Sequence, residues 1–164
     1  MRGDMGMIVK RIVLFGIMAA LSPARAQSLP DLDKEVMVLD GNCAATSKVA
    51  FSQGDSTQEI PFPCDKMVVS FHRKPRTFLI QFTDTKSKNE QVVGYAGDMG
   101  PNDDTLTFMR VNRLYILREP HPAQKGECIL TWNAKVLSTV VCGGRASVGD
   151  DVTATTIMGF EVGK

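Results

Sequence analysis

The sequence predicts an all-β protein, a single antiparallel β-sandwich or closed β-barrel of about eight to ten short strands braced by two disulfides. Three observations support this fold class. Apolar and polar residues alternate with a period of two through most of the chain, short runs of Gly, Pro, Asn and Asp separate the alternating segments, and the cysteines are even in number, with four in total. This pattern fits a sandwich and a barrel equally well.

The chain begins with the layout of a secretory signal peptide. Residues 10–11 are Lys-Arg, residues 12–21 are apolar, and residues 22–26 end in an Ala-x-Ala pattern. The apolar stretch has about ten residues, whereas a helix that crosses a bilayer needs about twenty. We therefore expect removal of residues 1–26 and export of residues 27–164. This single domain has no membrane span after cleavage, and we expect it to be periplasmic or secreted, with bacterial export as the simplest case.

The charge balance argues against a general attraction to nucleic acid. The chain has 19 Lys and Arg against 18 Asp and Glu, a net charge of +1. A protein so close to neutral has no overall field to hold it on a polyanion, so an anionic partner has to meet a local patch. We expect an exported protein or an anionic ligand as the partner. No motif indicates a cofactor.

The first part of the exported domain is ambiguous, and a hairpin follows it. Residues 29–39 fit one face of a helix, although residues 35–40 also fit a strand. The stretch between Cys43 and Cys64 reads as two strands that turn near Gly54-Asp55.

The clearest hairpin covers residues 67–82. Apolar residues alternate on both sides of a turn at residues 73–76. Folding about this turn sets three pairs opposite each other: Phe71 with Phe78, Val69 with Ile80, and Met67 with Phe82.

Later segments also read as strands. They are residues 91–96, 105–111, 114–118 and 152–162. We expect a tight turn at Asn112-Arg113 and a β-bulge at Gly159.

The phase of the hairpin at residues 127–142 predicts the disulfide pairing. If it folds about Lys135, three pairs share one face: Cys128 with Cys142, Leu130 with Val140, and Trp132 with Ser138. A Cys128–Cys142 bond leaves Cys43 to pair with Cys64. Neither redox chemistry nor a zinc site is indicated, because both favour a C-x-x-C spacing that is absent here.

The candidate binding site is the turn that contains His72, Arg73, Lys74 and Arg76. Arginines present forked hydrogen-bond donors to carboxylate, phosphate or sulfate groups, and a hairpin tip is open to partners. The alternative is a solvated turn whose charges and proline discourage association between sheet edges.

A weaker candidate, for calcium, lies in the loop predicted at residues 97–104. Its oxygen-bearing side chains are Asp98, Asn102, Asp103 and Asp104. They do not follow the EF-hand order, and turn chemistry alone also explains them, so we predict no metal site.

The sequence carries no catalytic signature. It has two histidines, His72 and His121, which we expect to be exposed, and no G-x-S-x-G or H-E-x-x-H pattern. Trp132 shares the phase of Cys128, so we expect it in the core rather than on a binding surface.

Three hypotheses for function follow. The first is a non-catalytic binding protein of the cell envelope or secretome that uses loops at one end of the sheet, for example an inhibitor of a secreted hydrolase. The second is a barrel that carries a small apolar ligand in a cavity. We expect this cavity to be lined by Phe71, Phe78, Ile80, Phe82 and Phe108. The third is an enzyme with a dispersed site, which requires an acid with a strongly perturbed pKa inside a cleft.

Overall fold

A computed structural model describes residues 36–72, 77–87 and 91–163, which form one antiparallel sheet of ten strands. In chain order the strands are β1 Val36–Cys43, β2 Lys48–Gln53, β3 Ser56–Pro61, β4 Lys66–His72, β5 Thr77–Asp84, β6 Gln91–Asn102, β7 Leu106–Ile116, β8 Glu119–Asn133, β9 Val136–Gly149 and β10 Val152–Val162. The predicted all-β class is confirmed. The signal peptide predicted at residues 1–26 lies outside the described residues.

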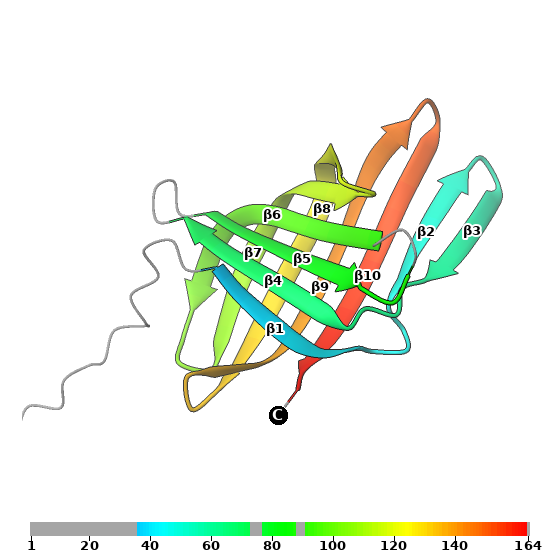
Figure 1. Cartoon of the computed structure of the whole chain (residues 1–164). Helices are drawn as coiled ribbons and strands as arrows, with labels where there is room; N and C mark the ends of the chain where they lie inside the picture. Colours follow the sequence, from blue (N-terminus) through cyan, green and yellow to red (C-terminus); the bar gives the residue numbers. More distant parts are fainter. Residues whose placement is uncertain (1–35, 73–76, 88–90, 164) are drawn as a thin grey trace, which may run out of the picture.

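The sheet curls until β1 meets β10. The hydrogen-bonded order is β1-β4-β5-β6-β7-β8-β9-β10-β2-β3, with an additional pairing of β1 and β10. That pairing covers only the three residues from Gly41 to Cys43, whereas Val36 to Asp40 pair with β4. The structure is therefore a single curled sheet rather than a sandwich, and the ring of eight strands is not evenly closed (Figure 1).

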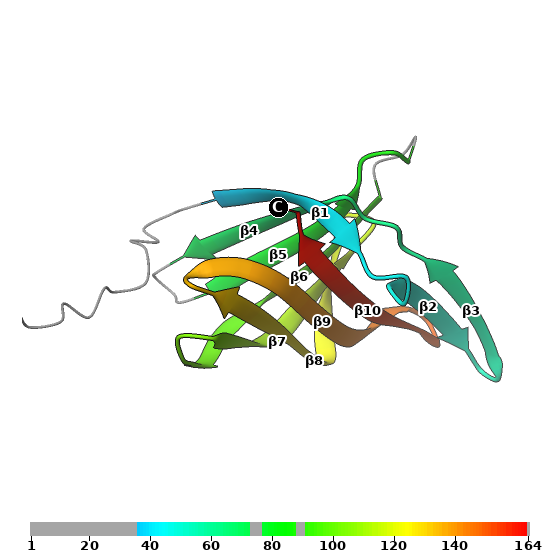
Figure 2. The same ribbon diagram turned by 90° about the horizontal axis from the view of Figure 1, so that it is seen from below.

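The β2–β3 hairpin extends from the side of this ring (Figure 2). β10 shares one edge between two partners: residues Val152–Ile157 pair with β2, and the end of the strand pairs with β1. The Cys43–Cys64 disulfide closes the base of the hairpin, since Cys43 ends β1 and Cys64 precedes β4. The hairpin is thus fixed both by strand pairing and by a covalent bond.

Most predicted registers are confirmed. β4 and β5 pair Phe71 with Phe78, Val69 with Ile80 and Met67 with Phe82, and both predicted disulfides are present. In β5 every second side chain is buried, as the alternation requires.

Other details of the strand assignment were wrong. Asn112-Arg113 is not a turn, because β7 continues through it with a bulge and the chain turns at Leu117-Arg118. A second bulge sets Trp132 opposite Leu137 instead of Ser138. Gly159 pairs regularly with Val141, and the irregularity in β10 lies at Val152 and Thr153. Periodicity does not distinguish a bulge from a turn, because both interrupt the alternation at one point, as the two exposed residues Asn112-Arg113 do in β7.

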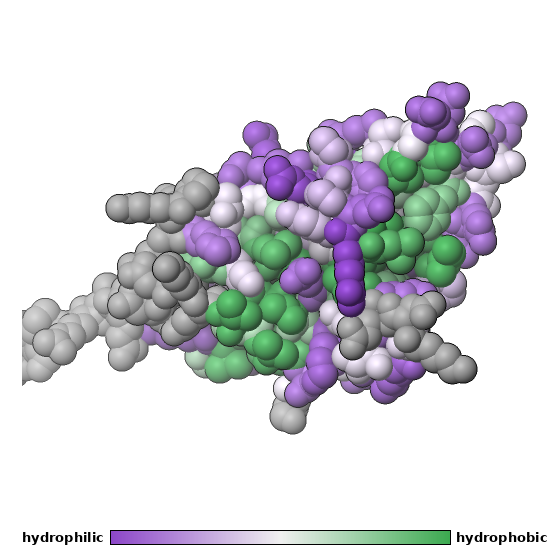
Figure 3. Space-filling model, turned by 45° about the horizontal axis from the view of Figure 1, so that its top comes forward, coloured by the Kyte–Doolittle hydropathy of each residue, from purple (hydrophilic) through white to green (hydrophobic). Residues whose placement is uncertain are grey.

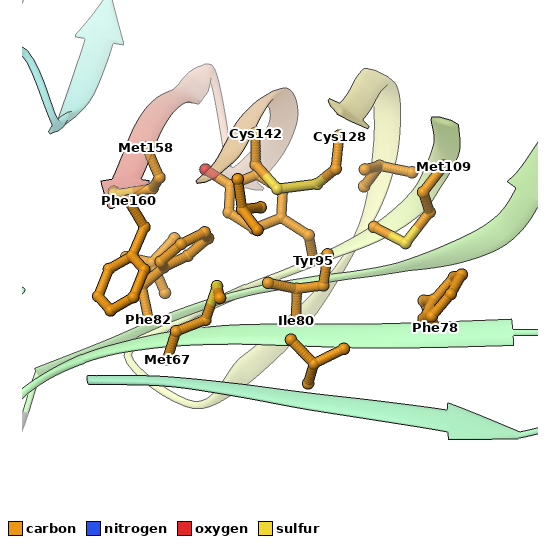
Figure 4. Packing of buried hydrophobic residues seen from close by; sticks show 14 of the residues in the cluster. Met67, Phe78, Ile80, Phe82, Tyr95, Met109, Cys128, Cys142, Met158 and Phe160 are labelled. Atoms are coloured by element: carbon orange, nitrogen blue, oxygen red, sulfur yellow. A yellow bond between two sulfur atoms is a disulfide. The ribbon is translucent and has the colours of Figure 1, made fainter. Parts of the chain in front are cut away.

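The core fills the inside of the ring. Phe82, Phe160 and Met67 pack together below the Cys128–Cys142 disulfide, whose cysteines are almost completely buried (Figure 4). Tyr95 crosses this interior from β6 and donates a hydrogen bond from its hydroxyl to Thr156 Oγ1 on β10 at 2.7 Å. Phe82 meets the ring of Tyr95 edge-on, with centroids 5.9 Å apart.

Candidate functional site

One end of the ring, which we call the mouth, carries an apolar cavity of about 190 Å³. It lies between the β2–β3 hairpin and the strands β6 and β7. The residues that line it are Val49, Phe51, Ile60, Phe62, Gln91, Val92, Val93, Ile116 and Leu117. Gln91 is the one polar residue in this set, and none is charged, so the cavity suits a neutral apolar group.

The hairpin supplies one wall through its inner face. Gly54 has a φ of +54° in the two-residue turn, a conformation that glycine adopts without strain. The turn sets Val49 opposite Ile60, and Val49 is also opposite the buried Thr156 of β10. Val49 is therefore in the phase that faces the interior, and Ile60, which is 38% exposed, shares that phase at the rim.

The opposite wall ends in a strained turn. Ile116 is buried at the end of β7, and the next two residues, Leu117 and Arg118, have φ values of +52° and +72°. Positive φ at both central residues is the type I′ pattern that joins antiparallel strands, and Asn and Gly are the residues it usually carries. Here a leucine that is 69% exposed adopts it, so an apolar side chain stands at the rim.

The Tyr95–Thr156 hydrogen bond lies in the core, on strands that adjoin the cavity. Tyr95 is two residues further along β6 than the lining residue Val93, and Thr156 is opposite the lining residue Val49. Burial raises the pKa of the Tyr95 phenol well above its ordinary value, although the hydrogen bond to Thr156 opposes this shift. The pair is therefore a neutral part of the core, and neither of its residues lines the cavity.

Hydrophobic residues also reach the surface near the mouth. In the view of Figure 3, a cluster of hydrophobic residues lies at the end of the molecule that carries the β2–β3 and β9–β10 hairpins. A second hydrophobic area lies apart from it in the same view. Only the first area adjoins a cavity of the described residues that is lined almost entirely by apolar side chains.

Of the residues predicted to form the basic turn, only His72 lies within the described part of the chain. Arg73, Lys74 and Arg76 lie outside the described residues, and His72 is exposed at the end of β4. His72 pairs with Thr77, at the end of the ring opposite the mouth. The turn therefore stays a sequence-based hypothesis.

The predicted calcium loop is mostly strand. Asp98 and Asn102 belong to β6, where Asp98 is opposite Arg110. Asp103 accepts hydrogen bonds from the backbone of Thr105 and Leu106, and the Thr105 hydroxyl adds a third. Hydrogen bonds from Thr105 lower the pKa of Asp103. The Asp103 carboxylate therefore stabilises the local turn. Asp104 is exposed, and no group of three or more acidic, His or Cys side chains among the described residues could hold a metal.

The remaining candidate residues also have the surroundings of structural rather than functional side chains. His121 lies half-buried within β8 rather than exposed in a loop. Trp132 packs against the core and donates a hydrogen bond to Thr107 Oγ1 at 3.1 Å, in agreement with its predicted role. Asp65 has a lowered pKa, but it is exposed and accepts bonds from Thr85, so it does not have the environment of a buried catalytic acid.

The five residues predicted to line a ligand cavity do not share one. Phe71, Phe78, Ile80 and Phe82 are buried in the core, whereas Phe108 lies on the outer face between two buried residues and is 38% exposed. Sequence reasoning missed the mouth cavity. The available signal was the apolar phase of the first hairpin, at Val49, Phe51, Ile60 and Phe62.

Comparison of the chain with protein-family models, with curated proteins and with solved structures finds no match. Across residues 36–72, 77–87 and 91–163 no helix is long and apolar enough to cross a membrane.

Proposed function

We propose that this chain is an exported, non-catalytic binding protein that holds a small neutral apolar ligand in the mouth cavity. The observation that carries the proposal is the uncharged, almost wholly apolar lining, with exposed Leu117 and Ile60 at its rim. An engineered apolar cavity of about 150 Å³ is large enough to bind benzene, so a ligand with one aromatic ring fits the volume found here.

The scaffold supports this role. Both disulfides favour an oxidising compartment, which agrees with export. The Cys43–Cys64 bond holds the base of the hairpin that forms one wall, so the wall is preorganised and less freedom is lost on binding.

The exposed leucine at the rim also favours a binding role. A leucine with positive φ costs about 1–2 kcal/mol, and Asn would fit this turn better. The Ala134-Lys135 turn has the same pattern of positive φ, so the exposed apolar side chain of Leu117 at the rim, rather than its backbone conformation alone, supports contact with a ligand.

The test is a titration of oxidised residues 27–164 with benzene, followed by methyl NMR, with benzoate as a charged ligand of the same ring. We expect saturable shifts at Ile60, Val93 and Ile116 with benzene and none with benzoate, because none of the described residues that line the cavity carries a positive charge. Equal shifts with both ligands, or none with benzene, would refute the proposal.

A pair of tryptophan variants provides the matched control. Ile60→Trp places a bulky ring in the cavity and should abolish the benzene shifts. Thr57→Trp adds the same ring to the other face of the hairpin, since Thr57 is three residues from Ile60 in the opposite phase. It should leave binding unchanged. A loss of binding in both variants would show that the hairpin as a whole, rather than the cavity, was disturbed.

A further inference from the structure

Two cations lie directly opposite each other on the outer face of the ring. Lys125 of β8 is opposite Arg145 of β9, and Arg145 is opposite Thr155 of β10. Like charges in directly opposite positions destabilise a sheet. Neither cation forms an ion pair or a side-chain hydrogen bond with another described residue.

These residues border a hollow of about 410 Å³ that runs over β8, β9 and β10. The hollow forms at Gly143, which faces outward and has no side chain. Gly143 is opposite Glu127 of β8 and Ile157 of β10. A Cβ built on Gly143 would come no closer than 3.7 Å to another atom, the Thr156 carbonyl oxygen. A side chain would therefore fit at this position, and glycine leaves the space open.

Among the described residues that line the hollow, positive charges outnumber negative ones. Glu127 is the one acid that lines it, and on its other side it is opposite Arg110 of β7. Arg110 is in turn opposite Asp98. The Lys125–Arg145 pair has no such acid directly opposite it, and the Thr155 hydroxyl beside it is a further hydrogen-bond donor.

We propose that this hollow binds the oxyanion group of a small molecule between Lys125, Arg145 and Thr155. An anion there replaces the repulsion of the two cations with charge-assisted hydrogen bonds. Ile157, which is 44% exposed at the other end of the hollow, offers a contact to an apolar part of the same ligand. This site differs in place and chemistry from the mouth cavity, and it does not depend on the function proposed there.

The experiment is a titration of oxidised residues 27–164 with inorganic phosphate at constant ionic strength, against chloride, followed by the amide NMR signals of Gly126, Gly143 and Gly144. We expect saturable shifts with phosphate alone. Arg145→Gln should weaken binding about tenfold, since it removes a charged hydrogen-bond donor. Arg113→Gln removes the same charge from an exposed position of β7 that does not line the hollow and is opposite Ala96 and Pro122, so it should change the affinity less than about twofold.

A thermal melt gives a second readout. Without phosphate, Arg145→Gln should melt at the same or a higher temperature than the native protein, because it relieves repulsion. With phosphate, the native protein should gain stability and the variant should not. Absence of saturable shifts, equal weakening by Arg145→Gln and Arg113→Gln, or a lower melting temperature of Arg145→Gln without phosphate would overturn the proposal.

Discussion

The Tyr95–Thr156 hydrogen bond allows a quantitative test of how the ring interior is held together. Both side chains are completely buried, and Thr156 Oγ1 also lies 3.4 Å from the carbonyl oxygen of Gly144. In Tyr95→Phe the threonine hydroxyl can still donate to Gly144, so we expect a loss of about 1 kcal/mol in the free energy of unfolding. In Thr156→Val the phenol hydroxyl stays buried without its partner, which should cost about 2–3 kcal/mol.

The double variant separates this explanation from simple loss of packing. Removing both polar groups leaves no unsatisfied hydroxyl, so Tyr95→Phe/Thr156→Val should lose only about 1 kcal/mol, less than the sum of the single losses. Urea denaturation of the four proteins measures these values, with Tyr115→Phe as a half-buried control that should be close to neutral. Additive losses, or a smaller loss in Thr156→Val than in Tyr95→Phe, would refute the reasoning.

The raised pKa of Tyr95 predicts how the stability of the fold changes at alkaline pH. Its folded pKa is raised above the unfolded value near 10, so the folded state keeps the proton that the unfolded state loses. The stability contributed by this difference is fully present below pH 10 and falls as the pH rises above it, by up to about 1.4 kcal/mol per pH unit. Tyr95→Phe should lose stability less steeply over this range, and an unchanged slope would contradict the burial of the phenol.

Three further predictions concern the turn at the mouth, the disulfides and the acid limb. Leu117→Asn should raise the free energy of unfolding by about 0.5–1 kcal/mol in a urea melt while it weakens benzene binding, because Asn tolerates positive φ but is polar; a destabilised variant would contradict the strain. Under partial reduction, peptide mapping should find Cys43–Cys64 open before Cys128–Cys142, since both sulfurs of the latter are buried, and the reverse order would count against this packing. The pKa of Asp103 is lowered by bonds from Thr105, so its contribution is present above about pH 4 and lost as the pH falls. Asp103→Asn should make the loss of stability at acid pH less steep. An unchanged pH dependence would show that the charge of Asp103 does not stabilise the turn.

Local alternation was sufficient to predict much of this fold. Both disulfides and the β4–β5 register followed from residue phase, because a buried face fixes register through every second side chain. The closure of the sheet did not follow, since the β1–β10 pairing joins Cys43 to Phe160 across almost the whole domain. Periodicity describes which face of a strand is buried, but not which distant strand lies beside it.

The mouth cavity was beyond sequence reasoning for a related reason. Its two walls come from residues 49–62 and 91–117, and they meet only because the ring curls. Leu117 was missed as well, because the expected turn lay at Asn112-Arg113 and the bulge in β7 carries the strand past it. The position of a rim residue depends on the bulge, which interrupts the alternation at Asn112-Arg113 in the same way as a turn.

A crystal of oxidised residues 27–164 soaked with bromobenzene tests the central claim most directly, because bromine can be located by its anomalous scattering. We expect one bromine peak in the mouth cavity, in contact with Phe51, Ile60 and Ile116. A cavity without a peak, or bromine bound only elsewhere on the protein, would contradict a ligand site at the mouth.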